Sequence, residues 1–177
     1  MSNAQYLASL VNSSGNIVIP VANAGIVFNN TNTTASPTST TQNDYETGTW
    51  TPTLSSGSGS YSSVTYTRQY GKYTKIGNLV YASIDLNTSS QTVGTASSDL
   101  LIAGLPFTIA SASYTDSFTG YIAYQGGLVS NPLGLLQNSA SGTKMYIGLL
   151  AGSTLQVSSQ GTTGFGIRGT FIYPATF

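Results

Sequence analysis

The chain has 177 residues, and only 6% of them are charged, with five Lys and Arg against five Asp and Glu. This balance provides no basic surface for nucleic acid and no attraction to an anionic membrane, so we exclude both as main partners. The sequence holds neither His nor Cys, which excludes a Ser-His-Asp triad, disulfides and thiolate metal sites. With 40% apolar residues, the chain has enough hydrophobic surface for one folded domain with an appendage.

Residues 1–28 carry more apolar residues than a free tail needs. Two segments, 17–20 and 25–28, are predicted strands, and such short strands are not stable alone. We therefore expect this arm to anchor the chain on a neighbouring subunit or another protein. The residues expected to make the contact, three of them at helical spacing, are Leu7, Leu10, Val11, Ile17, Ile19, Ile26 and Phe28. The N-terminus lacks the basic and apolar regions of a signal peptide, which predicts synthesis in a cytoplasm.

Residues 29–43 are almost wholly Asn, Thr, Ser and Gln. This composition offers too little apolar surface to offset the entropy of ordering, so it predicts a flexible linker. A folded domain is predicted from residue 44 to residue 177. It opens with a predicted strand, Thr49–Leu54, in which Pro52 indicates a sheet edge or a bulge.

From this point short β-prone segments alternate with Gly, Ser and Asn clusters, and no helical periodicity of any length appears. Gly77-Asn78 has the chemistry of a two-residue hairpin turn. The pattern predicts an all-β fold, an antiparallel β-sandwich of jelly-roll type. The further predicted strands are Val64–Tyr66, Gln69–Ile76, Leu79–Leu86, Leu100–Ala103, Ser117–Tyr124, Lys144–Leu150, Thr154–Ser158 and Gly166–Tyr173.

The acidic residues are the remaining candidates for catalysis. Asp44 and Glu46 project from one side of an extended segment, but a turn or backbone contact is the ordinary use of acids at such a junction. Asp85, Asp99 and Asp116 are dispersed and have no calcium-loop spacing. We therefore predict no catalytic, cofactor-binding or metal site, and a protein that is not an enzyme.

The sequence contains twelve tyrosines, for which two interpretations are open. Five of them gather early in the domain, at Tyr61, Tyr66, Tyr70, Tyr73 and Tyr81. Alternate aromatic residues form cross-strand pairs and line subunit interfaces, and this interpretation is favoured. The alternative is that their rings stack on the sugar rings of a receptor glycan.

Four segments carry a family resemblance. Residues 44–52 are Asp-Tyr-Glu-Thr-Gly-Thr-Trp-Thr-Pro, residues 71–80 hold Tyr-Thr-Lys-Ile-Gly-Asn, residues 102–107 hold Gly-Leu-Pro-Phe, and residues 168–172 hold Gly-Thr-Phe. In this order they resemble the β-rich module of tailed-phage and prophage fibre, tailspike and appendage proteins, whose signature is Asp-Tyr-Glu-Glu-Gly-Thr-Trp-Thr-Pro. The strand segments of the arm resemble the pair that often precedes this signature. Thr47 replaces the second acid of the signature.

The resemblance implies a trimeric β-sandwich displayed on a virion, without catalytic machinery. The short arm and linker favour a knob held close to its anchoring surface. We therefore expect a capsid decoration (cement) protein, a homotrimer that docks on the major capsid protein at the outer capsid surface through its arm and reinforces the shell. The alternative is a receptor-binding knob of a tail fibre or tailspike that recognises host surface glycan.

Overall fold

The computed structural model describes residues 26–27, 41–42, 44–110, 119–128, 132–137, 142–149, 154–159 and 164–176. The chain divides into two compact units, Met1–Tyr45 and Glu46–Phe177. In the first unit, β1 (Ile26–Val27) pairs antiparallel with β2 (Thr41–Gln42). Of the predicted anchoring residues, Ile26 lies in β1, while Leu7, Leu10, Val11, Ile17, Ile19 and Phe28 lie outside the described residues.

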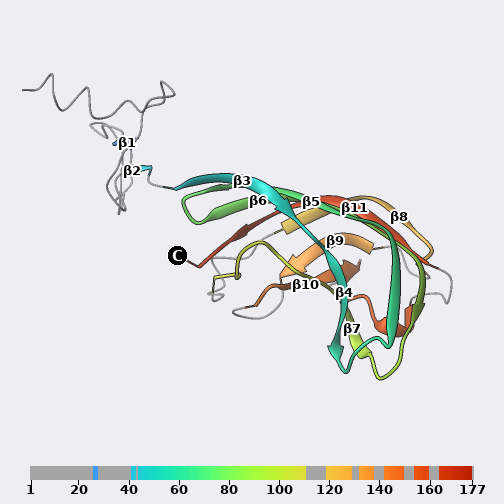
Figure 1. Cartoon of the computed structure of the whole chain (residues 1–177). Coiled ribbons are helices and arrows are strands. Elements are labelled where there is room, and N and C mark those ends of the chain that lie inside the picture. The colour runs from blue at the N-terminus through green and yellow to red at the C-terminus, as the bar shows by residue number, and fades with distance from the viewer. Residues whose placement is uncertain are drawn as a thin grey trace, which may run out of the picture. The chain divides into compact units, whose positions relative to one another are not determined.

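The second unit is built on one nine-stranded antiparallel ladder with the order β3-β5-β6-β11-β8-β9-β10-β7-β4. The ladder folds into two packed layers, with β3, β5, β6, β11 and β8 in one and β9, β10, β7 and β4 in the other (Figure 1). The predicted all-β sandwich is therefore confirmed. The strands are β3 (Tyr45–Trp50), β4 (Thr53–Ser58), β5 (Ser63–Ile76), β6 (Leu79–Thr92), β7 (Ser97–Ala103), β8 (Thr119–Gly126), β9 (Pro132–Gln137), β10 (Lys144–Leu149) and β11 (Gly166–Pro174).

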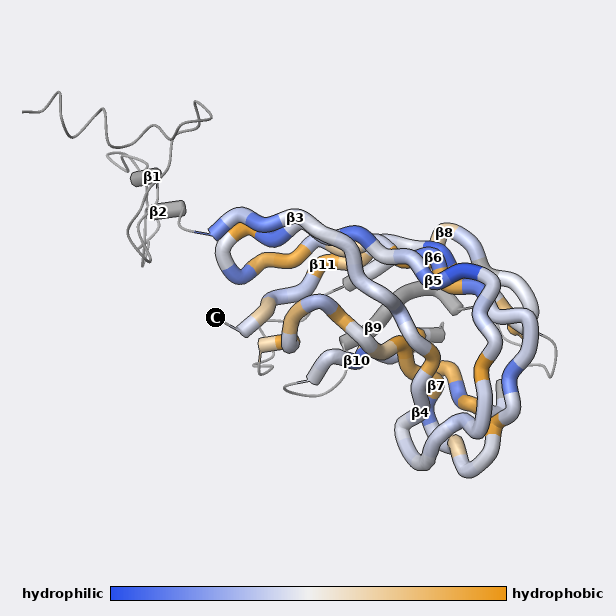
Figure 2. The backbone as a smooth tube through the Cα atoms, viewed as in Figure 1, coloured by the Kyte–Doolittle hydropathy of each residue, from blue (hydrophilic) through white to orange (hydrophobic). Residues whose placement is uncertain are grey.

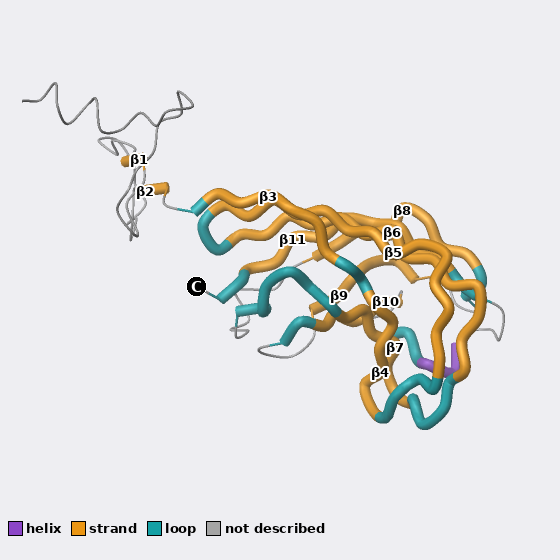
Figure 3. The backbone as a smooth tube through the Cα atoms, in the orientation of Figure 1, coloured by secondary structure: helices purple, strands orange, loops and turns teal. Residues whose placement is uncertain are grey.

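Several predicted strand boundaries differ from the observed ones (Figure 3). Segments 64–66 and 69–76 are one strand, β5, because a register shift around Thr67 keeps both halves paired with β6. The predicted strand Thr154–Ser158 is wrong, since Thr154 and Gln156 form isolated bridges and a 3-10 turn follows at Val157–Ser159. Strand β9 was not predicted, because it starts with a proline and contains a glycine, both of which indicate turns in a sequence. The Gly77-Asn78 hairpin is confirmed, with Ile76 opposite Leu79 and a φ of 59° at Gly77.

The predicted strand Thr49–Leu54 is divided at Thr51 and Pro52 into β3 and β4. These two strands follow each other in the chain but lie at opposite ends of the ladder. Pro52 thus connects two edge strands, as its missing N–H requires. Because one short connection joins both ends, the sheet has to curl until its edges approach each other.

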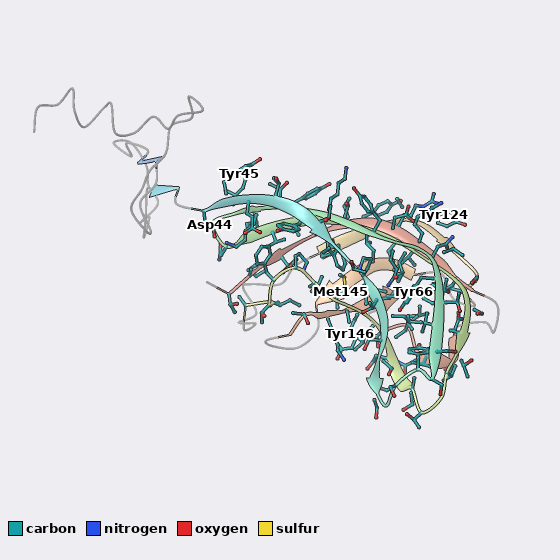
Figure 4. The ribbon with its side chains drawn as sticks, in the orientation of Figure 1. Asp44, Tyr45, Tyr66, Tyr124, Met145 and Tyr146 are labelled. Carbon is teal, nitrogen blue, oxygen red and sulfur yellow. The ribbon has the colours of Figure 1, made fainter. Side chains whose placement is uncertain are left out.

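Alternation along the strands places one face of each layer in a shared core. On β6, residues 80, 82, 84 and 86 are buried while the residues between them face outward. Apolar segments run along both layers in Figure 2, and Met145 of β10 lies between the layers in Figure 4, fully buried. The largest fully buried side chains are Tyr173, Phe165, Phe171, Leu86, Leu100, Ile102, Ile109, Met145, Ile147, Leu155 and Ile167.

Trp50 sits where the sheet closes. A Cβ atom on Gly71 of β5 would lie 2.1 Å from the Trp50 indole nitrogen, so the ring occupies the space that a side chain would fill. The indole N–H donates to the carbonyl oxygen of Ser83 in β6 at 3.1 Å, and the ring meets Phe171 edge-on at 6.0 Å. Trp50 therefore ties the edge strand β3 to three strands of its own layer.

Side chains of β5 also bond to the backbone at the start of β4, the edge strand at the other end of the ladder. The Leu54 N–H of β4 donates to the Tyr66 hydroxyl at 2.9 Å, and the Gln69 amide donates to the Pro52 carbonyl at 3.0 Å. Both bonds satisfy backbone groups beside the break between β3 and β4. The Tyr66 hydroxyl is partly buried, and this burial raises its pKa.

Replacing Trp50 with Ala is expected to lower the free energy of unfolding by about 3 to 5 kcal/mol, because the ring is buried and its loss leaves a cavity. Urea titration followed by circular dichroism measures this. An unchanged unfolding midpoint would show that the ring contributes nothing to the core.

A second substitution tests the close approach itself. Gly71→Ala should destabilise the sandwich by about 1 to 3 kcal/mol, because the added methyl group overlaps the indole. Gly142→Ala is the matched control, since the nearest atom to its added Cβ is 3.9 Å away. Equal melting temperatures for the two variants would contradict this packing.

Candidate binding face

The segments that carry the family resemblance meet around one tyrosine. The Tyr73 hydroxyl of β5 donates to the carboxylate of Glu46 in β3, and Gly48 lies against the Tyr73 ring. The ring also meets Phe107 edge-on, with 5.1 Å between the ring centres. The hydrogen bond to the Glu46 carboxylate raises the pKa of Tyr73, because the phenolate form would lose this bond. Glu46 therefore holds a structural contact.

Phe107 also connects to the last strand. The buried Tyr173 hydroxyl accepts a hydrogen bond from the Phe107 N–H at 3.2 Å and lies 3.3 Å from the Phe107 carbonyl oxygen, to which it donates. Burial raises the pKa of Tyr173 well above its ordinary value. The Lys75 ammonium lies 5.4 Å from the centre of the Phe107 ring. The first three segments that carry the resemblance thus meet at Tyr73 and Phe107, and the fourth joins them through the contact of Phe171 with Trp50 and through Tyr173, which follows it directly.

The other candidate acids are also held by structural partners. Asp85 of β6 accepts hydrogen bonds from Arg68 of β5 at 3.2 Å and from Arg168 of β11 at 3.1 Å. Asp99 of β7 accepts bonds from Thr154, from Gln156 at 2.8 Å and from Ser98 at 3.2 Å. These bonds, that from Thr154 above all, lower the pKa of Asp99.

The candidate acids Glu46, Asp85 and Asp99 lie on three different strands, β3, β6 and β7. Asp116 lies outside the described residues. Within them, no group of three or more acidic residues is placed to hold a metal ion, and no helix is long and apolar enough to cross a membrane.

The five tyrosines between residues 61 and 81 lie on two different sides of their layer. Tyr61, Tyr66 and Tyr73 pack against the core, whereas Tyr70 and Tyr81 are exposed on the outer face. Tyr70 and Tyr73 are three residues apart on β5 and therefore point to opposite faces. Tyr66 and Tyr70 are four residues apart and still lie on opposite faces, because the register of β5 shifts between Tyr66 and Arg68.

Two residues from β8 join the exposed tyrosines. Tyr121 and Tyr124 are 68% and 50% exposed on the outer face of the same layer, and Figure 4 shows Tyr124 there. Their spacing of three residues would place them on opposite faces of a regular strand. A register shift between Arg168 and Gly169 of the partner strand β11 gives β8 one extra residue, so both rings point outward. Sequence reasoning missed them because no pattern indicates this bulge.

The outer face of β5, β6, β11 and β8 consists of three cross-strand rows. The first is formed by Tyr70, Asp85, Arg168 and Tyr124, and the second by Lys72, Ser83, Thr170 and Tyr121. In the third row Thr74, Tyr81 and the exposed Ile172 lie side by side. We call these three rows, together with Arg68, the tyrosine face.

Cations lie over two of the rings of the tyrosine face. The Arg168 guanidinium carbon is 5.0 Å from the centre of the Tyr124 ring, and the Lys72 ammonium is 5.7 Å from that of Tyr70. The first contact fixes Arg168 from one side while Asp85 holds it from the other. Rings and charges in this part of the face are therefore pre-oriented.

Two shallow grooves flank Tyr81. The larger has a volume of about 560 Å³ and is lined by Thr47, Gly48 and Thr49 of β3, by Lys72, Tyr73 and Thr74 of β5, and by Tyr81 and Ser83 of β6. The smaller, of about 330 Å³, is lined by Tyr81, Gly120, Tyr121, Thr170, Phe171 and Ile172. Both volumes fall in the range of small-ligand sites, roughly 300 to 1,000 Å³. Hydroxyl groups, aromatic rings and one ammonium group thus surround two adjoining open spaces.

Comparisons with known proteins agree with the fold. A solved structure, that of the Dettilon tailspike protein, matches 73% of this chain with a TM-score of 0.55 and 24% sequence identity. The chain spans 24% of the length of that tailspike, so the likeness is to one part of a larger protein. No protein-family model matches the sequence, and no curated protein matches it. The tailspike shares its fold with this chain over the matched region.

The Asp99 contacts predict a pH dependence of stability. Because the pKa of Asp99 is lower in the folded than in the unfolded state, its bonds stabilise the fold above the unfolded value of about 4 and are lost as pH falls through the folded value. Asp99→Asn should therefore be less stable than wild type at about pH 7, with the difference shrinking below about pH 4. Urea midpoints across this range measure it. A difference that stays constant with pH would contradict the assignment.

Proposed function

We propose that this chain is a structural protein of a bacteriophage virion. The observation that carries the proposal is that three of the four resembling segments meet at Tyr73 and Phe107, while Tyr173, the residue after the fourth, bonds to Phe107. These contacts support a common structural role for the motifs. The fold likeness to the Dettilon tailspike supports it. The acids that could serve catalysis support a role without enzymatic activity, since Glu46, Asp85 and Asp99 each bind structural partners.

Within the virion, the chain acts as a capsid decoration protein. The division into a small N-terminal unit and a sandwich supports this role, because one unit can dock while the other is displayed. In this proposal residues 1–28 dock on the major capsid protein, three chains associate as a homotrimer on the outer capsid surface, and the docked trimers reinforce the shell by mass action. The chain is made in the host cytoplasm before assembly.

A second candidate function is a receptor-binding knob of a tail fibre or tailspike. The exposed rings of the tyrosine face favour it, since rings with open faces are suited to contact host surface glycan. The fold likeness to a tailspike is a further argument for this location.

The copy number of the chain in purified particles separates the two locations. Quantitative mass spectrometry against the major capsid protein should find this chain at a copy number comparable to that of the shell subunits if it decorates the capsid. A copy number similar to that of the tail proteins would instead support the receptor-binding knob, and the absence of the chain from particles would contradict both.

Deleting residues 1–28 tests the arm. The sandwich should keep its melting temperature, because it forms a compact unit of its own from Glu46 onward. Binding to capsids that lack the protein should be lost, as measured by co-sedimentation. A truncated chain that still co-sediments with capsids would show that the sandwich itself docks.

A further inference from the structure

The net charge of zero hides a local separation of charge. Three of the five cations in the chain, Arg68, Lys72 and Arg168, lie on the tyrosine face, and they are accompanied by one of the five acids, Asp85. The face therefore has an excess of two positive charges. The sequence count excluded an electrostatic role because it cannot show which residues share a face.

The Asp85 carboxylate pairs with both arginines, so Lys72 is the cation of this face that can bind a ligand. Among the described residues Lys72 forms no ion pair, it is exposed, and it lines the larger groove beside Tyr81. Its contact with the Tyr70 ring orients the ammonium group along the face without neutralising it. A ligand in this groove thus meets a cation at a defined position.

The linings of the two grooves suit a sugar. A pyranose ring presents C–H groups on its faces and hydroxyl groups around its rim. The C–H faces pack on aromatic rings, which Tyr81 and Tyr121 supply, and the hydroxyls need donors and acceptors, which Thr49, Ser83 and Thr170 supply. Because Tyr81 borders both grooves, one chain of linked sugars can occupy the two of them.

We propose that the tyrosine face binds an anionic polysaccharide, one whose sugars carry carboxylate or phosphate groups. Tyr81 stacks on a sugar between the two grooves, Lys72 binds the anionic group, and Arg168 adds to the positive field. This inference rests on the receptor-binding candidate above and names its site and ligand class. If the chain decorates the capsid, glycan binding by this face is a second activity beside reinforcement of the shell.

The same charges argue against two other occupants. The same face of a second copy would bring like charges together, which costs free energy at an interface. A nucleic acid is anionic and has rings, but it is bound through many phosphate contacts, and this face offers three cations of which two are already paired with Asp85.

Binding of the full chain to an array of polysaccharides tests the proposal. The array carries uronic-acid, sialic-acid and phosphate-bearing polysaccharides beside neutral ones of matched length, and these arms distinguish carboxylate from phosphate ligands. Binding to at least one anionic class, weakened by salt, is expected. Equal binding to neutral glycans, no binding to any glycan, or tighter binding to single-stranded DNA would overturn the proposal.

Variants locate the site on the tyrosine face. Tyr81→Ala should weaken binding about tenfold while Tyr81→Phe keeps most of it, because the ring stacks. Lys72→Gln should weaken binding about fivefold, whereas Lys144→Gln, the same change on β10 of the other layer, should leave it unchanged. Equal losses for the two lysine variants would overturn the site. Unchanged melting temperatures confirm that each variant is folded.

Sedimentation of the full chain separates a failure of the glycan-binding proposal from a failure of the proposed virion role. Loss of self-association in Tyr81→Ala would show that the face is buried between copies, which overturns the glycan site. A chain present in particles but without glycan binding would overturn this inference alone, since the copy number tests the virion role separately.

Discussion

The fit of Trp50 against Gly71 is the constraint on which the sandwich depends. The chain must turn from one edge of a nine-stranded sheet to the other within Thr51 and Pro52, and this is possible only if the sheet closes on itself. The indole ring occupies the space above a residue without a side chain and bonds to the next strand at Ser83. Two side-chain bonds from β5 then satisfy the backbone on the far side of the break. Closure therefore needs specific residues in β3 and β5.

This constraint separates the structural residues from the candidate binding residues. Inward-facing residues of the segments that resemble the phage module make structural contacts, since Tyr73 bonds to Glu46 and packs on Phe107. Alternate residues of the same segments, Lys72 and Arg168 among them, lie on the tyrosine face. The residues on the outer face of the same layer do not take part in these contacts. Its tyrosines, hydroxyls and cations are arranged by strand register, so they can change without loss of the fold. A module built in this way can keep one scaffold and vary its ligand.

The fold class, the hairpin at Gly77 and the edge position of Pro52 could be predicted from the sequence, because each depends on local turn chemistry or on alternation. The candidate binding face could not be predicted in this way. Tyr70 and Tyr73 are three residues apart and lie on opposite faces, whereas Tyr121 and Tyr124 have the same spacing and share one face, since a bulge intervenes. The separation of charge also depends on register, because Arg68, Asp85 and Arg168 come from three strands. Strand β9 could not be predicted either, because its proline and glycine, Pro132 and Gly134, also favour turns.

Electron cryomicroscopy of the assembled particle shows which surface of the sandwich contacts other proteins. We expect density for the N-terminal unit against the particle and a tyrosine face that is open to solvent around Tyr81. A map in which β5, β6, β11 and β8 are covered by the capsid, a tail protein or a second copy of the chain would contradict the account.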